Sequence, residues 1–135
     1  MDMATVLREL NWLAVLVAAL STFVLGGVWY TVFDRQWTKA NGFTEGYLKD
    51  RNMALVFGLS FVFSLVMALN LALFIGKEGV AFGLFAGFMA GFGWVTLAIG
   101  IIALFEKRPF SYLLINGGYM VVAFTMMGGI LGLWK

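Results

Sequence analysis

The sequence predicts an all-α, polytopic membrane protein: one domain (residues 1–135) in which four transmembrane helices form an antiparallel bundle. Hydrophobic residues make up 62% of the 135 residues and charged residues only 12%, whereas a soluble domain is about half apolar and a quarter charged. The apolar residues fall into four long runs without a Lys, Arg, Asp or Glu. Each run is long enough to cross a bilayer core as a helix.

The four predicted spans cover residues of about 11–33, 53–75, 80–105 and 110–134. Charged segments separate them, and the two short ones, 76–79 and 106–109, predict tight turns between antiparallel neighbours. The only proline, Pro109, opens the last span, where a missing N–H costs little. The runs are continuous rather than alternating, which argues against a β-barrel. The first run exceeds the apolar core of a usual signal peptide, so we expect it to remain as a span.

Two shorter helices are expected outside the bilayer core. Residues 2–10 predict an amphipathic lead-in at the membrane interface, with Met3, Val6, Leu7 and Leu10 on one face; a frayed terminus is the alternative. Within the loop 34–52, Thr44 is a candidate N-cap for a surface helix.

The distribution of Lys and Arg predicts the orientation in the cell (inner) membrane. The side of both termini carries three such residues: Arg8, Lys77 and Lys135. The other side carries six: Arg35, Lys39, Lys49, Arg51, Lys107 and Arg108. Because cytoplasmic loops are enriched in positive charge, the loops 34–52 and 106–109 are expected in the cytoplasm and both termini outside, in the periplasm.

Small residues recur every four positions in all four spans. The third span carries Gly79, Gly83, Gly87 and Gly91, so they share one helical face. The other spans add further rows: Ala14, Ala18, Thr22 and Gly26 in the first; Ser60, Ser64, Ala68, Ala72 and Gly76 in the second; Gly128 and Gly132, with Thr125 and Gly129 on another row, in the fourth. Small residues let helices approach closely in lipid, so these rows predict packing seams. The partner is either another helix of the same chain, a second copy, or a planar ligand.

The phenylalanines of the third span, Phe82, Phe85, Phe88 and Phe92, cover its other faces. We expect them to contact lipid and fill the core; a phenylalanine-lined ion path is the alternative.

Neutral polar residues form a candidate binding layer inside the membrane. By the helical rise, five of them lie about 9–16 Å from the predicted cytoplasmic ends of their spans: Ser60, Ser64, Thr96, Asn116 and Tyr119. Asn116 and Tyr119 are three residues apart and face one way. The layer either holds the bundle in register through hydrogen bonds or forms a pocket for a small solute.

The sequence lacks the residues that several kinds of functional site require. The chain has no Cys and no His, so thiol chemistry and a metal centre are not expected, and neither is a cofactor. The net charge of +2 comes from scattered basic residues, so nucleic acid is not an expected partner. No ionisable residue lies in a span, which argues against proton-coupled drug export. A lipid-modifying enzyme would require Asp34, Glu106 and Arg108 to meet at one surface.

Three stretches, NWLAVLVAAL followed by GGVWY, NGFTEGYLKDRNMA, and FEKRPFSYLLINGGYMVVAFTMMGGILGLW, carry a family resemblance. Together they resemble the domain-of-unknown-function family 1761 (DUF1761) over nearly the whole chain. The resemblance implies a small bacterial-type integral membrane protein of four helices and implies no activity. Its matching positions are Trp29, Tyr30, Asn116, Gly118 and Tyr119.

From these observations we expect a non-enzymatic membrane protein whose partners are the lipid bilayer and other membrane helices. It would act through helix packing, as a homo-oligomer or as an accessory subunit of a membrane complex. The alternative is an oligomeric channel or facilitated carrier for a small solute.

Overall fold

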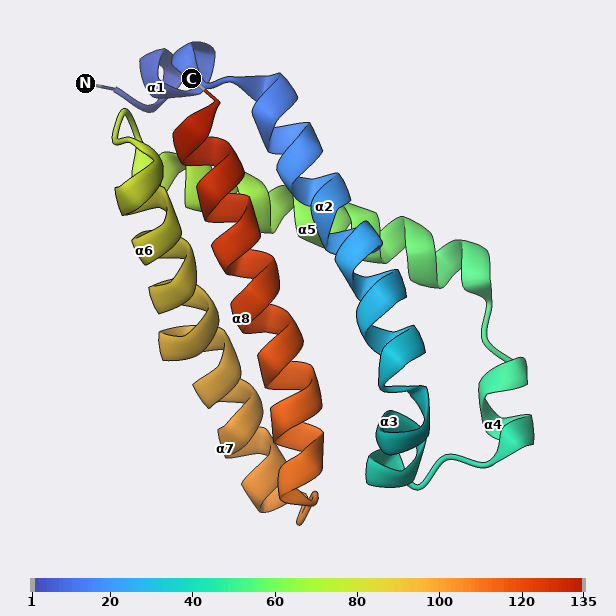
Figure 1. The fold of residues 1–135 in the computed structure, drawn as a ribbon. Coiled ribbons are helices and arrows are strands. Elements are labelled where there is room, and N and C mark those ends of the chain that lie inside the picture. Colours follow the sequence, from blue (N-terminus) through green and yellow to red (C-terminus); the bar gives the residue numbers. More distant parts are fainter. Residues whose placement is uncertain (1, 135) are drawn as a thin grey trace.

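The computed structural model describes residues 2–134, apart from the side chain of Glu45, and all regular structure in that range is helical (Figure 1). Four helices are long and apolar enough to cross a membrane. They are α2 (Trp12–Val32), α5 (Met53–Ile75), the continuous run of α6 (Val80–Ala90), η1 (Gly91–Thr96) and α7 (Leu97–Phe105), and α8 (Phe110–Leu133). The predicted fold class and the four spans are confirmed.

Helix α8 is the central element. It contacts α2, α3, α5, α6, η1 and α7, and Figure 1 shows it between α2 on one side and the α6–α7 run on the other. The two flanking spans run antiparallel to α8. We call the end with α1 (Met3–Glu9), the turn 76–79 and Trp134 the terminal end. The opposite end, with α3 (Asp34–Asn41) and α4 (Glu45–Lys49), is the loop end.

Helix α5 departs from a regular bundle because it crosses obliquely behind α2 and α8 (Figure 1). Only its second half packs inside the chain, where the buried residues are Ser64, Ala68, Leu71, Ala72 and Ile75. Residues 53–60 are exposed throughout. The first half of α5 therefore separates from α2 towards the loop end. The small residues Ala14, Ala18 and Ala68 are at most 1% exposed in the core where the helices cross, beside Met127.

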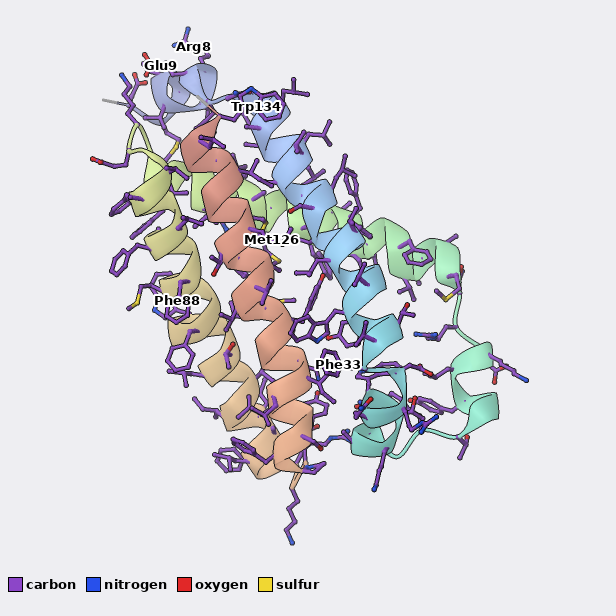
Figure 2. The ribbon with its side chains drawn as sticks, in the orientation of Figure 1. Arg8, Glu9, Phe33, Phe88, Met126 and Trp134 are labelled. Atoms are coloured by element: carbon purple, nitrogen blue, oxygen red, sulfur yellow. The ribbon has the colours of Figure 1, made fainter. Side chains whose placement is uncertain are left out.

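The terminal end is closed by contacts between distant segments. Figure 2 shows α1, with Arg8 and Glu9, beside Trp134 at this end. The Asn11 side chain donates from Nδ2 to the Trp134 carbonyl at 3.2 Å, and Lys77 forms an exposed ion pair with Glu9 at 3.8 Å. Lys135, which the predicted orientation counts, lies outside the described residues.

The lead-in helix α1 forms where the amphipathic pattern predicts it. Asp2 caps it by accepting from the Thr5 N–H at 2.8 Å, and this hydrogen bond lowers the pKa of the Asp2 carboxyl. Val6, Leu7 and Leu10 are half-buried, whereas Met3 is exposed.

The loop between the first two spans contains more helix than the sequence predicted. Helix α3 follows α2 after Phe33, although its charged sequence DRQWTKAN predicts a loop. It ends at Gly42, whose positive φ of 70° suits glycine. Ala40 is buried and Trp37 half-buried, so α3 has an apolar side that packs on α8. Helix α4 begins after Thr44 as predicted, but the Thr44 side chain makes no capping hydrogen bond.

The third span is not a uniform α-helix, because residues Gly91–Thr96 adopt π-helical geometry. The Thr96 hydroxyl donates to the Gly91 carbonyl, five residues back, at 2.8 Å. Its oxygen also lies 3.0 Å from the Gly117 carbonyl of α8. Single π-turns of this kind are often found at functional sites. The widened turn thus faces α8 through Thr96.

Candidate functional site

The glycine row of the third span faces α8. A Cβ atom added to Gly83 would overlap the carbonyl oxygen of Gly128, and one added to Gly87 would overlap that of Phe124. A Cβ on Gly91 would lie 2.8 Å from the Met120 carbonyl oxygen. The two helices therefore meet backbone against backbone, an approach that only residues without side chains permit.

The ends of this seam differ. A Cβ on Gly132 would lie 2.6 Å from the Gly79 carbonyl oxygen, whereas one on Gly79 would meet nothing within 4 Å.

The phenylalanines of the third span lie mainly on its outer face. Phe85, Phe88 and Phe92 are 45–60% exposed on the α6–η1 run, and Figure 2 shows Phe88 on its outside.

The remaining small residues lie elsewhere. Ala14, Ala18, Ala68 and Ala72 are buried where α2 and α5 cross. Gly26 instead faces a polar group: a Cβ there would lie 3.1 Å from the Tyr119 hydroxyl oxygen.

Three hydrogen bonds tie α2 to α8 between the middle of the two helices and the loop end. The Trp29 indole donates to the Ile115 carbonyl at 2.9 Å, and the Tyr30 hydroxyl donates to Asn116 Oδ1 at 2.7 Å. The Tyr119 hydroxyl donates to the Thr22 carbonyl at 2.8 Å. Phe33 extends this contact, with its ring 5.0 Å from the Trp29 ring, in the space between α8 and α3 (Figure 2). Four of the five positions that carry the family resemblance take part in these bonds.

The fifth position, Gly118, allows α8 to pack closely against the Trp29 side chain of α2. A Cβ on Gly118 would lie 2.9 Å from Cζ2 of Trp29. Gly118 therefore leaves the space that the indole occupies.

The structure does not gather the five residues of the predicted polar layer into one site. Ser64 is 9% exposed, and its hydroxyl oxygen lies 3.1 Å from the Thr22 hydroxyl, which donates to the Ala19 carbonyl at 2.7 Å. Thr96 lies on the other side of α8 at Gly117. Because α8 passes between α2 and η1, its successive residues face different neighbours. Asn116 and Tyr119 thus face α2, and Thr96 cannot reach them.

An open cleft lies between α2 and the first half of α5. It measures about 760 Å³. We call it the polar cleft. Ser60, Asn116 and Tyr119 of the predicted layer line it together with Tyr30. Asp34 and Arg51 line its loop end, and Phe23, Val56 and Phe57 supply apolar wall.

Three further residues belong to this region. The sequence places Thr22 in the small-residue row of the first span, and Trp29 and Tyr30 among the positions that carry the family resemblance. It does not assign any of the three to the polar layer, because their contacts with α8 appear only in the folded structure.

A second hollow, of about 520 Å³, lies between the second half of α5 and the α6–η1 run. We call it the Asn70 groove. Asn70 is the only polar side chain other than the Trp94 indole among the residues that line it: Met67, Leu71, Phe74, Ala86, Met89, Ala90, Gly93, Val95 and Phe124. No hydrogen bond joins the Asn70 amide to another residue of 2–134.

The structure does not bring Asp34, Glu106 and Arg108, the three residues that a lipid-modifying enzyme would require, into one site. Arg108 lies 3.6 Å from the Glu106 carboxylate and donates at 3.5 Å to the carbonyl of Asn41, at the end of α3. Asp34 begins α3 and lines the polar cleft instead. Within residues 2–134, no group of acidic side chains is arranged to hold a metal ion.

Comparison with curated proteins and with solved structures gave no significant match. The family model described as "Protein of unknown function (DUF1761)" matches residues 13–132. The match covers nearly all of the four spanning helices together with the seam, the polar cleft and the Asn70 groove. The chain therefore belongs to the DUF1761 family of proteins of unknown function.

Proposed function

We propose that the protein is a non-enzymatic membrane protein that works as a homo-oligomer joined at the Asn70 groove. The amide of Asn70 is the observation that carries the proposal. It lies on an apolar wall within the spanning helix α5, five residues before the helix ends at Ile75, without a hydrogen-bond partner in residues 2–134. An amide without a partner is costly in lipid, and acyl chains offer it neither a donor nor an acceptor.

A second copy of the chain supplies the missing groups. An amide has both a donor and an acceptor, so two Asn70 side chains can exchange two hydrogen bonds across a two-fold axis. Asparagine is among the residues that join helices in this way in membranes.

The opposite wall of the groove leaves room for an incoming helix. Ala86, Ala90 and Gly93 lie on one face of the third span, and all three line the groove. A Cβ on Gly93 would meet nothing within 4 Å, unlike Gly83, Gly87 and Gly91, which contact α8. Gly93 thus presents a free small-residue surface, which supports close approach by a second copy.

Native mass spectrometry in mild detergent tests the proposal. Wild-type protein should retain an oligomer, Asn70→Leu should shift it to monomer, and Asn70→Gln should restore part of it. Val62→Leu, at an exposed position on the same helix outside the groove, is the matched control and should leave the oligomer intact. Wild-type protein that is monomeric without any co-purifying protein would contradict the proposal. Monomers bound to a different membrane protein would favour an accessory subunit.

We further propose that the loop end faces the cytoplasm of a bacterial inner membrane. Arg35, Lys39, Lys49, Arg51, Lys107 and Arg108 all belong to segments at this end. Arg8 and Lys77 belong to the terminal end. The bias follows the positive-inside rule.

A facilitated carrier for a small solute is the second candidate, and the polar cleft favours it. The cleft offers hydroxyl and amide groups from Tyr30, Asn116 and Tyr119. It does not continue through the chain, because Thr22 and Ser64 are buried at its inner end. Transport would require α2 and α5 to separate further. Solute flux into liposomes tests this function, and flux at background across ions and small neutral solutes would contradict it.

A further inference from the structure

We propose that the polar cleft binds one glycerophospholipid with a zwitterionic phosphoethanolamine head group. The cleft changes in chemical character along its length. Charged side chains lie at the loop end, hydrogen-bonding groups lie deeper, and apolar rings line the walls. A phospholipid has the same sequence of head group, ester groups and acyl chains. The inference does not depend on the Asn70 groove.

The cleft lies where lipid can enter from the side. Leu55 and Phe57 are 56–57% exposed on the first half of α5, which is part of a spanning helix. A lateral opening at this depth meets acyl chains rather than water. Its volume of about 760 Å³ falls within the range of about 300–1,000 Å³ that ligand sites occupy.

Two opposite charges stand at the loop end without pairing. Asp34 and Arg51 line the same cleft, yet neither takes part in the two ion pairs found in residues 2–134. Arg51 donates from Nε to the Leu48 carbonyl at 3.0 Å, which leaves its terminal amino groups available. A guanidinium binds phosphate well, and a carboxylate suits an ammonium group. An ethanolamine head group carries both charges.

The next layer of the cleft offers a hydrogen-bond donor. Asn116 Oδ1 accepts from Tyr30, so its amide N–H groups remain to donate. No fully buried side-chain nitrogen or oxygen in the described chain lacks a partner, so the Asn116 amide nitrogen is accessible, and Asn116 lines the cleft. Asn116 lies about 9 Å from the start of α8 by the helical rise. An ester carbonyl of a lipid held by its phosphate at Arg51 can accept from it there.

Binding to the full-length protein tests the site. Phosphatidylethanolamine and phosphatidylglycerol with identical acyl chains are titrated in mild detergent and followed by native mass spectrometry. Wild-type protein should prefer phosphatidylethanolamine. Arg51→Gln should weaken its binding about tenfold, as expected for one charge-assisted hydrogen bond. Asp34→Asn should abolish the preference over phosphatidylglycerol. The controls Arg35→Gln and Asp50→Asn remove the same charges from neighbours that do not line the cleft and should bind as wild type.

A second test fills the cleft without altering a charge and pairs a cleft variant with a control outside the cleft. Gly27 lines the cleft, and neither Gly27 nor Gly58 has an atom within 4 Å of an added Cβ. Gly27→Leu should exclude the lipid, whereas Gly58→Leu, on α5 outside the cleft, should not. Equal binding of both lipids to wild type, or equal effects of each variant and its control, would overturn the proposal. Displacement of the lipid by soluble phosphoethanolamine at the same concentration would also overturn it. Wild-type protein that is monomeric but still binds phosphatidylethanolamine would refute the proposed homo-oligomer and leave the lipid site standing.

Discussion

Gly83 of α6 and Gly128 of α8 meet backbone to backbone: a Cβ atom added to either one would overlap the carbonyl oxygen of the other. Close helix contact of this kind in a membrane depends on dispersion forces and on weak hydrogen bonds between backbones. The contact fixes the position of the third span against the central helix. Helix α6, which this contact holds against α8, also supplies Ala86, Met89 and Ala90 to the wall of the Asn70 groove.

Gly83→Ala and Gly128→Ala should each destabilise the protein by about 1–3 kcal/mol, because overpacking forces the helices apart. Unfolding by SDS in mixed micelles measures the change. Gly58→Ala is the control, since nothing lies within 4 Å of its added Cβ. It should be neutral or slightly stabilising, because alanine favours helix. Equal stability of the Gly83→Ala and Gly58→Ala proteins would refute the seam.

Thr96→Val should cost about 0.6–2 kcal/mol, the range for hydrogen bonds within membrane bundles. The substitution removes the hydroxyl that donates to Gly91 and approaches Gly117. Hydrogen exchange of the amides in 91–97 should also change, and Thr96→Ser should restore both properties. Thr125→Val removes a hydroxyl bonded only within its own helix. A Thr96→Val protein no less stable than Thr125→Val would show that the contact with α8 is not needed.

Tyr30→Phe should destabilise the protein by about 0.6–1.7 kcal/mol, because Asn116 Oδ1 loses its donor inside the membrane. Tyr112→Phe removes a hydroxyl without a hydrogen bond to any residue of 2–134 and serves as the control. Both free energies of unfolding are measured in mixed micelles. If the two variants lose the same amount, the bond between α2 and α8 contributes nothing specific.

The proposed orientation predicts which positions a membrane-impermeant maleimide can reach in intact cells. The chain has no cysteine, so single substitutions suffice. Glu78→Cys in the terminal-end turn should react before lysis, and Gly46→Cys in α4 only after it. The opposite pattern would place the loop end outside.

Much of the fold could be predicted because bilayer thickness and hydrophobicity fix the length and place of each span. Three features could not be. Helix α3 has a charged sequence, and its helical state depends on packing Trp37 and Ala40 near α8. The oblique path of α5 follows from packing that apolar composition does not encode. The π-turn at Gly91–Thr96 depends on a tertiary contact between Thr96 and Gly117.

The candidate sites were predictable in part. The step of four residues indicated which small residues share a face, but it could not tell which helix they meet. Asn116 and Tyr119 fall on one face by their spacing, and both line the polar cleft. Thr96 lies at a similar depth, yet depth alone does not show that α8 separates it from them. The sequence alone does not single out Asn70, because its apolar surroundings appear only when α5 and the α6–η1 run are placed side by side.

Disulfide crosslinking in native membranes tests the proposed assembly most directly. Phe74 lies one turn from Asn70 in the groove and is 62% exposed, and Phe63 lies on the same helix outside the groove and is 61% exposed. With two copies related by an axis along the membrane normal, Phe74→Cys should give a covalent dimer on mild oxidation and Phe63→Cys should not. Equal crosslinking of the two variants, or no dimer from Phe74→Cys, would contradict association through the Asn70 groove.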